Sequence, residues 1–83
     1  MDRLIHKMRI TNDSNIPMVF QLEPECLQFS VAPNEEIIVT YDYEVEPLEL
    51  RLGQTSDPVF GAIVPGDGNV LIEKDGKDVF DQK

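Results

Sequence analysis

Apolar and polar side chains alternate along most of the chain with a period of two. In the first such segment Met8 and Ile10 fall on one face, and Lys7 and Arg9 fall on the other. Successive side chains of a strand point to opposite faces, so this alternation predicts strands with one buried face and one exposed face. Such segments, or short continuous apolar runs, occupy residues 4–10, 18–23, 26–31, 36–45, 48–52, 59–64, 69–74 and 77–80. No window shows the apolar spacing of a helix with a capping residue before it.

Turn-forming residues separate the predicted strands. Residues 11–17 are rich in Asn, Asp and Ser, Pro47 interrupts a strand pattern, and Asp75-Gly76 is a strong hairpin signal. Short strands at spacings of about 8–12 residues are typical of sandwiches and small barrels. We therefore predict an all-β fold, an antiparallel β-sandwich or open barrel of about seven to eight short strands. One small acidic domain spans residues 1–83.

The longest predicted strand covers residues 36–45 and carries the acidic residues Asp42 and Glu44. Its alternation places Tyr41, Tyr43 and Val45 on the buried face. Asp42 and Glu44 then point outward, with Glu46 following, at about 6.6–7 Å between successive side chains. A register shifted by one residue would invert this assignment.

The same alternation predicts which residues form the core. The run over residues 59–64 is apolar throughout and is either covered on both faces or central in the sandwich. The residues expected in the core are Met8, Ile10, Phe20, Leu22, Leu27, Phe29, Val31, Val39, Tyr41, Leu50, Ile63 and one of Val70 and Leu71.

Composition and charge narrow the classes of molecule that can be a partner. The chain has 83 residues, of which 41% are hydrophobic and 28% charged, as in a folded globular domain, and its formal net charge is −9. From Ile10 to Leu50 there are nine acids and no lysine or arginine. This balance disfavours nucleic acid and anionic membranes as partners, since both attract positive charge. It favours a protein partner with a basic surface, although negative charge also serves solubility.

Cysteine usage and the N-terminal sequence suggest a compartment. Cys26 is the single cysteine, so no internal disulfide is available and a reducing environment is expected. No apolar run reaches the roughly 18 residues of a membrane span, and no signal-peptide pattern is present. We expect a cytoplasmic protein, in which the glycosylation-like triplet beginning at Asn12 has no consequence.

Catalytic and metal-binding patterns are weak. His6 aligns with the buried face of its strand and Cys26 lies beside Leu27, so packing explains both better than a Cys/His dyad does. Two such residues are too few for a structural zinc site. Residues 66–69 and 73–78 resemble calcium loops only faintly, and a divalent-cation site is the weakest alternative. We expect no enzymatic activity and no cofactor.

The acidic side chains allow two interpretations. They form either a solvated strand face that guards an edge against aggregation, or a docking face for a basic protein. The predicted partner-binding residues are Asp42, Glu44, Glu46, Glu49, Glu35 and Glu36. The leading hypothesis is a non-enzymatic protein-binding module, such as a small acidic inhibitor or an immunity-type protein. The alternative is an assembly domain that forms a homo-oligomer through a strand edge or an apolar patch.

Three segments carry a resemblance to small, uncharacterised bacterial all-β domains: Ile10–Pro24, Phe29–Val39 and Ile72–Phe80. In those domains an Asn/Asp turn precedes a strand that ends in Leu-Glu-Pro, and a proline-centred turn opens the next long strand. The chain departs from this pattern at Glu25-Cys26, where the resembling domains commonly have Trp-Gly. The resemblance implies a compact all-β fold and carries no activity.

Overall fold

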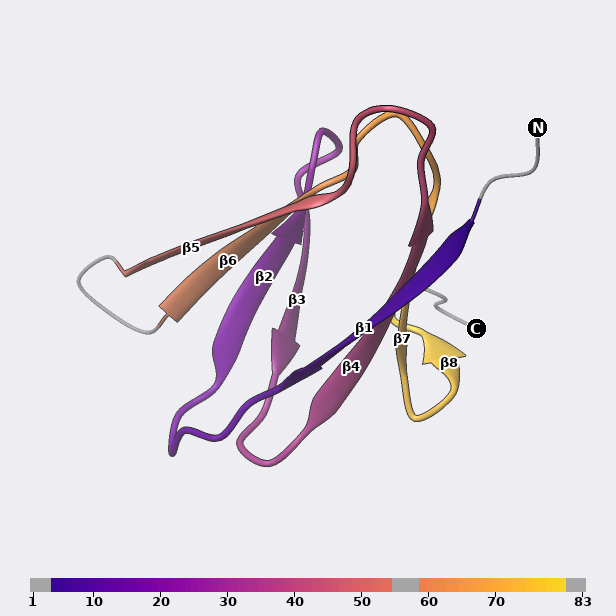
Figure 1. Ribbon diagram of the computed structural model, residues 1–83. Helices are drawn as coiled ribbons and strands as arrows, with labels where there is room; N and C mark the ends of the chain where they lie inside the picture. The colour runs from indigo at the N-terminus through magenta and orange to yellow at the C-terminus, as the bar shows by residue number, and fades with distance from the viewer. Residues whose placement is uncertain (1–3, 55–58, 81–83) are drawn as a thin grey trace.

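The fold is a sandwich of two four-stranded β-sheets (Figure 1). The computed structural model describes residues 4–54 and 59–80, and this part of the chain contains no helix. The strands are β1 (Ile5–Thr11), β2 (Met18–Leu22), β3 (Leu27–Val31), β4 (Glu36–Asp42), β5 (Glu49–Gln54), β6 (Val59–Val64), β7 (Val70–Lys74) and β8 (Lys77–Asp78). The predicted all-β class is confirmed.

One strand pairing differs in direction from all the others. The first sheet has the order β1-β4-β7-β8 and the second has the order β3-β2-β6-β5. Every pairing is antiparallel except that of β2 with β6, which is parallel. The expectation of a wholly antiparallel fold is therefore wrong at this pair. The chain crosses to the second sheet before β5, and β6 follows β5 there, so β6 joins β2 from a distant part of the sequence rather than through a hairpin.

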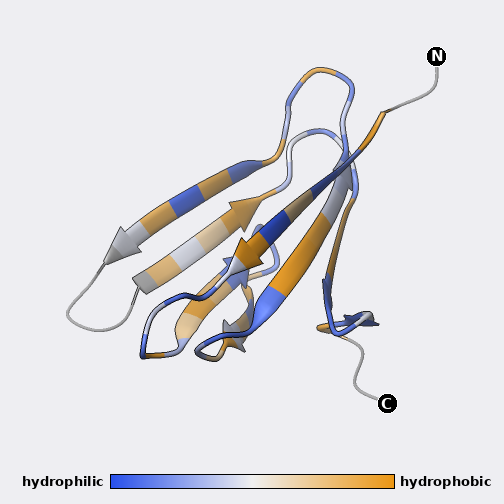
Figure 2. Ribbon diagram, turned by 60° about the horizontal axis from the view of Figure 1, so that its bottom comes forward, coloured by the Kyte–Doolittle hydropathy of each residue, from blue (hydrophilic) through white to orange (hydrophobic). Residues whose placement is uncertain are grey.

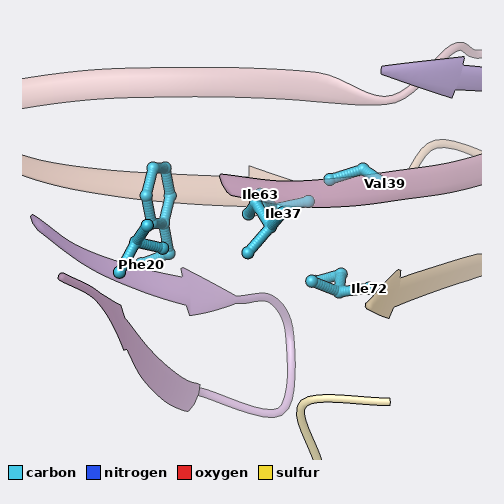
Figure 3. Packing of buried hydrophobic residues seen from close by; sticks show 6 residues of the cluster. Phe20, Ile37, Val39, Ile63 and Ile72 are labelled. Carbon is cyan, nitrogen blue, oxygen red and sulfur yellow. The ribbon is translucent and has the colours of Figure 1, made fainter. Parts of the chain in front are cut away.

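Apolar side chains from both sheets meet in one core (Figure 3). Figure 2 shows the alternating hydropathy along the strands that produces it. The fully buried apolar residues are Phe20, Val31, Ile37, Val39, Ile63 and Ile72. Of the predicted core, Leu27 is wrong because it is 43% exposed. Of the alternatives Val70 and Leu71, Val70 packs against the core, while Leu71 is 41% exposed. Leu71 lies opposite Thr40 on the outer face, so Val70 is the inward neighbour. Ile37 and Ile72 were not predicted, although Ile37 shares the predicted buried face of Tyr41.

Gly61 shows why the apolar run of β6 contains a glycine. Phe20 of β2 pairs with Gly61, and a Cβ at position 61 would stand 2.5 Å from the Phe20 ring. The ring in turn stacks on Phe29 with a centroid distance of 5.6 Å. Glycine in a strand commonly marks such a close approach. β6 therefore lies inside the second sheet, as one of the two predicted alternatives required, while its outer face carries the half-buried side chains of Phe60 and Ala62.

The strand predicted over residues 36–45 ends three residues early, at Asp42. The Asp67 carboxylate accepts hydrogen bonds from the backbone N–H groups of Glu44, Val45 and Glu46, at 2.9, 2.9 and 3.1 Å. In a strand successive N–H groups point in opposite directions, so three consecutive donors on one carboxylate require the chain to curl. The prediction that Val45 faces the core is wrong, because this side chain is 75% exposed.

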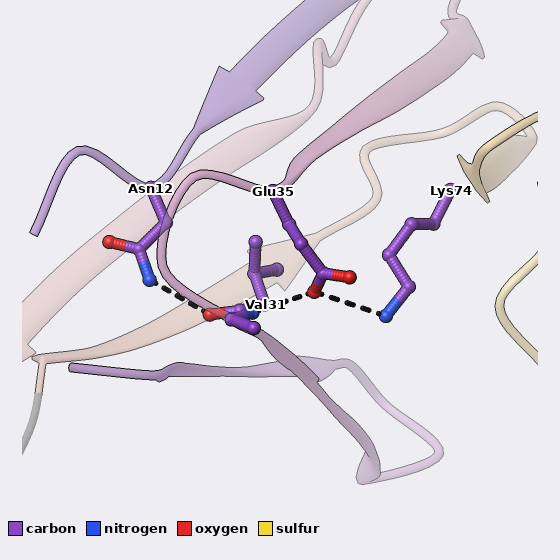
Figure 4. Close-up of polar contacts among 5 residues, drawn as sticks. Asn12, Val31, Glu35 and Lys74 are labelled. Carbon is purple, nitrogen blue, oxygen red and sulfur yellow. Dashed lines mark hydrogen bonds and ion pairs between the residues drawn. The ribbon is translucent and has the colours of Figure 1, made fainter. Parts of the chain in front are cut away.

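A buried asparagine joins the connection between β1 and β2 to the connection between β3 and β4 (Figure 4). Both lie at the end of the sandwich opposite to Asp67. Asn12 has no exposed surface, and its Nδ2 donates to the carbonyl oxygens of Ile16 and Val31 at 2.9 and 2.8 Å. Its Oδ1 accepts from the backbone N–H and the hydroxyl of Ser14. All of its amide groups are thus used inside the fold, which leaves no amide proton free for the glycosylation that its sequence triplet suggests.

Candidate functional site

Three connections gather at one end of the sandwich, which we call the acidic end (Figure 1). They are residues 23–26 between β2 and β3, residues 43–48 between β4 and β5, and residues 65–69 between β6 and β7. None of these three segments contains a lysine or arginine. With the flanking strand residues, the acids of this end are Glu23, Glu25, Asp42, Glu44, Glu46, Glu49 and Asp67. Charges that lie apart in the sequence are therefore concentrated on one end of the molecule.

The second and third connections are tied to each other by hydrogen bonds. Asp67 donates its backbone N–H to the carbonyl of Glu46 at 3.0 Å. The Oδ1 of Asp42 accepts the backbone N–H of Asn69 at 2.7 Å, and the Asp42 N–H returns to the Asn69 carbonyl at 3.2 Å. A Cβ at Gly68 would overlap the Asp42 carbonyl, so this approach requires glycine. The acidic end is consequently a preorganised surface rather than a pair of independent loops.

A shallow depression opens where these two connections meet. Three of its lining residues are acids, namely Glu46, Glu49 and Asp67. Three others are apolar, namely Pro47, Val64 and Pro65. An apolar surface beside several carboxylates suits a long cationic side chain, whose methylene stem and charged head need different surroundings.

The structure divides the six predicted partner-binding residues into two groups. Glu44, Glu46 and Glu49 are exposed at the acidic end. Asp42 is at the same end but is half-buried and holds the Asn69 backbone. Because the chain curls after Asp42, the predicted straight ridge of evenly spaced carboxylates is wrong. Glu35 and Glu36 lie at the other end of β4, which is seven residues long.

Glu35 and Glu36 have local partners at that other end. Glu35 accepts the backbone N–H of Ala32 at 2.8 Å and lies 3.4 Å from the ammonium of Lys74 (Figure 4). The hydrogen bond from Ala32 is the main cause that lowers the pKa of the Glu35 carboxyl; desolvation opposes it, and the nearby Lys74 ammonium lowers the pKa further. Glu36 lies 3.8 Å from the guanidinium Nε of Arg9. These contacts fit a role in holding the turn together.

His6 and Cys26, the candidates for a dyad, occupy different surroundings. His6 on β1 stacks against Tyr41 and Tyr43, with ring centroids 5.3 and 5.2 Å away. Cys26 is exposed in the turn between β2 and β3, where its thiol contacts the Glu23 carboxylate at 3.8 Å. The structure thus places the imidazole in an aromatic cluster and the thiol in a turn of the other sheet.

Sequence reasoning missed the part that Asp67 plays at this end. The sequence pattern of residues 66–69 indicates only a faint resemblance to a calcium loop, although the Asp67 carboxylate organises the neighbouring connection. The available signal was an acid between Gly66 and Gly68, since glycines on both sides allow close approach of another backbone.

In residues 4–54 and 59–80 no group of three or more His, Cys, Asp or Glu side chains is arranged to hold a metal ion. The described part of the chain also contains no helix with the length and apolarity needed to cross a lipid bilayer.

Comparison with known proteins finds no matching family model, no matching curated protein and no matching solved structure. The role of the acidic end therefore has to follow from its own residues.

Proposed function

We propose that the domain is a non-enzymatic protein-binding module whose acidic end docks on a basic surface of a partner protein. The observation that supports this is the depression at the junction of two connections, where Glu46, Glu49 and Asp67 surround apolar side chains. Such a surface offers a partner both apolar contact area and charge. A strand face that only interacts with solvent would need the charge but not the apolar area. A small inhibitor or an immunity-type protein acts in this way, by occupying a basic region of its target.

The chemistry of recognition follows from the lining of the depression. A lysine or arginine of the partner places its aliphatic stem against Pro47 and Pro65, and its charged head among the carboxylates. The surrounding acids of the same end speed association by attracting the basic surface from a distance. The backbone hydrogen bonds that fix the two connections reduce the ordering cost of binding. The single exposed thiol of Cys26 supports a reducing compartment, and we propose the cytoplasm.

Affinity capture from the host lysate, followed by titration of the captured protein, tests this function. We expect Glu46→Lys to weaken binding about tenfold or more, because one attraction is lost and a repulsion is gained, and we expect wild-type affinity to fall with added salt. Asp13→Lys makes the same change of net charge at the opposite end, where Asp13 is exposed, and serves as the matched control. Equal losses in the two variants, or an affinity indifferent to salt, would contradict docking through the acidic end.

The alternative, an assembly domain, is favoured by a separate observation. Several large apolar side chains are strongly exposed, among them Ile5 at 71% and Leu52 at 62%. Both lie on edge strands, β1 and β5. Exposed apolar residues on strand edges are characteristic of pairing surfaces. Light scattering of the purified domain distinguishes a stable homo-oligomer from a monomer that binds a different protein.

A further inference from the structure

β5 is an edge strand whose inner face is only partly covered. It pairs with β6 on one side, and in residues 4–54 and 59–80 no strand pairs with its other side. Leu50 and Leu52 face the same side as Ile63, toward the core, because they lie opposite Ile63 and Gly61. Leu50 is nevertheless only half-buried, and Leu52 is 62% exposed. Figure 1 shows the reason, since β5 and β6 extend away from the first sheet and leave the inner face of β5 open.

The sequence of β5 is complementary to itself when two copies run antiparallel. A two-fold axis at Leu50 places Glu49 opposite Arg51 of the second copy, and Arg51 opposite its Glu49. The same register places Leu50 opposite Leu50, and Leu52 opposite Leu48. Opposite charges then meet on the outer face and leucines meet on the inner face, which are the cross-strand pairs that stabilise a sheet.

The neighbouring two-fold registers lack this complementarity. An axis at Arg51 would place two arginines opposite each other, and an axis at Glu49 would do the same with two glutamates. Like charges directly opposite destabilise a pair. Directly opposed residues of an antiparallel pair must have side chains on the same face. A two-fold axis therefore passes through a residue, and the neighbouring registers move this axis by one residue along the strand. The charges therefore select the register centred on Leu50.

The other long edges do not combine these properties. An antiparallel self-pairing of β1 centred on Met8 would place Lys7 opposite Arg9, which are both cations. On β3 the inner-face ring of Phe29 is already covered, because Phe80 packs against it edge-on at 5.6 Å. Of these three edge strands, only β5 has both an uncovered apolar face and charged residues that lie opposite residues of opposite charge in a second copy.

We propose that two copies of the domain associate through β5, antiparallel and centred on Leu50, so that their second sheets become one continuous eight-stranded sheet. The occupant of the open edge is thus a second copy of this chain. Charge complementarity sets the register, and burial of the exposed Leu52 side chain, with further burial of Leu50, supplies the apolar contact. Symmetric pairing of this kind is closed, so it gives a dimer rather than a fibre. This interface shares Glu49 with the depression of the proposed docking function, but it does not depend on that function.

Charge swapping tests the register. We expect the wild-type domain to show a concentration-dependent dimer in sedimentation equilibrium, and Arg51→Glu to weaken dimerisation about tenfold or more, since both opposed pairs become repulsive. The double variant Glu49→Arg/Arg51→Glu restores opposite charges in the same register and should return the dimer. The residues paired with these positions on β6 are Val64 and Ala62, which carry no charge, so the swap leaves the β5–β6 pairing intact. A monomer at all concentrations, or a double variant as weak as the single one, would overturn the proposal.

Cross-linking between two different single variants tests the geometry independently of affinity. In a Cys26→Ser background, Glu49→Cys protein is mixed with Arg51→Cys protein under mild oxidation. The proposed register brings these two positions to a Cα separation of about 4.5–5.5 Å, within the range of a disulfide. The mixture should form a disulfide-linked heterodimer, while each variant alone should form little, because position 49 does not oppose position 49. Both sites are exposed, so folding is preserved. Equal cross-linking in the mixture and in the single variants would refute this register. Glu46→Lys should leave the dimer unchanged, which separates this result from the docking test.

Discussion

Asn12 illustrates how much of this fold depends on a single polar side chain. Its amide is fully buried and links Ile16, Val31 and Ser14, while its backbone N–H and C=O bond to Glu35 and Asn34 at 2.9 and 2.8 Å. A buried polar group stabilises a structure only when its hydrogen bonds are complete, and here they are. The side chain therefore fixes where two connections between the sheets meet.

Replacing Asn12 by aspartate keeps its shape and removes its two donors. At neutral pH the carboxylate would face the carbonyl oxygens of Ile16 and Val31, so we expect Asn12→Asp to lose about 3 kcal/mol of unfolding free energy. Burial beside these carbonyls raises the pKa of the introduced carboxyl in the folded state. The loss is thus largest above that pKa and shrinks as the pH falls below it. Urea denaturation at pH 7 and pH 4 measures the difference from wild type. Asn15→Asp, at an exposed position of the same connection, is the control and should lose little.

At the scale of elements, Asp67 decides where β4 ends and how the acidic end is shaped. Its carboxylate binds three successive N–H groups of the connection after β4, and its own N–H binds the Glu46 carbonyl. The residues from β4 onward would otherwise continue the strand, as their β-branched and aromatic composition suggests. A contact from a distant turn thus overrides the local preference of the chain.

Removing the Asp67 carboxylate should release this connection. We expect Asp67→Ala to lower the unfolding free energy by about 1–2 kcal/mol, because hydrogen bonds to a charged acceptor are lost. Asp67→Asn keeps one acceptor oxygen and should lose less. Amide exchange at Glu44, Val45 and Glu46 should speed up in Asp67→Ala, and amides in the middle of β4 should change little. Unchanged exchange at these three amides would contradict the assigned role.

These two residues also show how far the sequence can predict the structure. Alternation predicted every strand to within a few residues, because each strand has one face against the core, and Phe20 and Val39 followed directly from it. The curl after Asp42 and the parallel pairing of β2 with β6 depend on contacts between distant residues, which local patterns do not encode. The candidate site was predicted in part: the acids were recognised, but their division between two ends depends on strand direction.

At the scale of the whole molecule, negative charge is unevenly distributed. The formal net charge is −9, and the three connections of the acidic end contain no lysine or arginine. The opposite end has acids as well, but Lys74 and Lys77 flank the turn between β7 and β8 there. Repulsion among the acids of one end therefore opposes folding more than repulsion at the other.

Salt should stabilise the domain by screening this repulsion. Raising NaCl from about 0.05 M to about 0.5 M should increase the Tm by several degrees, since about 1 kcal/mol corresponds to about 4–8 °C in a domain of this size. Glu25→Gln/Glu46→Gln should raise the Tm at low salt and reduce its salt dependence. Asp13→Asn/Asp75→Asn removes the same charge at the opposite end and should raise the Tm and reduce its salt dependence less. Calorimetry measures the Tm of each variant at both salt concentrations. Identical salt responses in the two double variants would argue against an uneven distribution of negative charge.

The interior positions of β6 and β7 have a consequence for how the protein is made. β6 lies between β2 and β5, and β7 lies between β4 and β8, while Ile63 and Ile72 on these strands are fully buried. During synthesis, a nascent chain that has not yet released these strands from the ribosome can complete neither sheet. Its earlier strands, which include the β2–β3 hairpin, would expose unpaired edges and apolar faces. We therefore expect the domain to fold only after β7 has left the ribosome, and its incomplete chains to be natural clients of ribosome-associated chaperones.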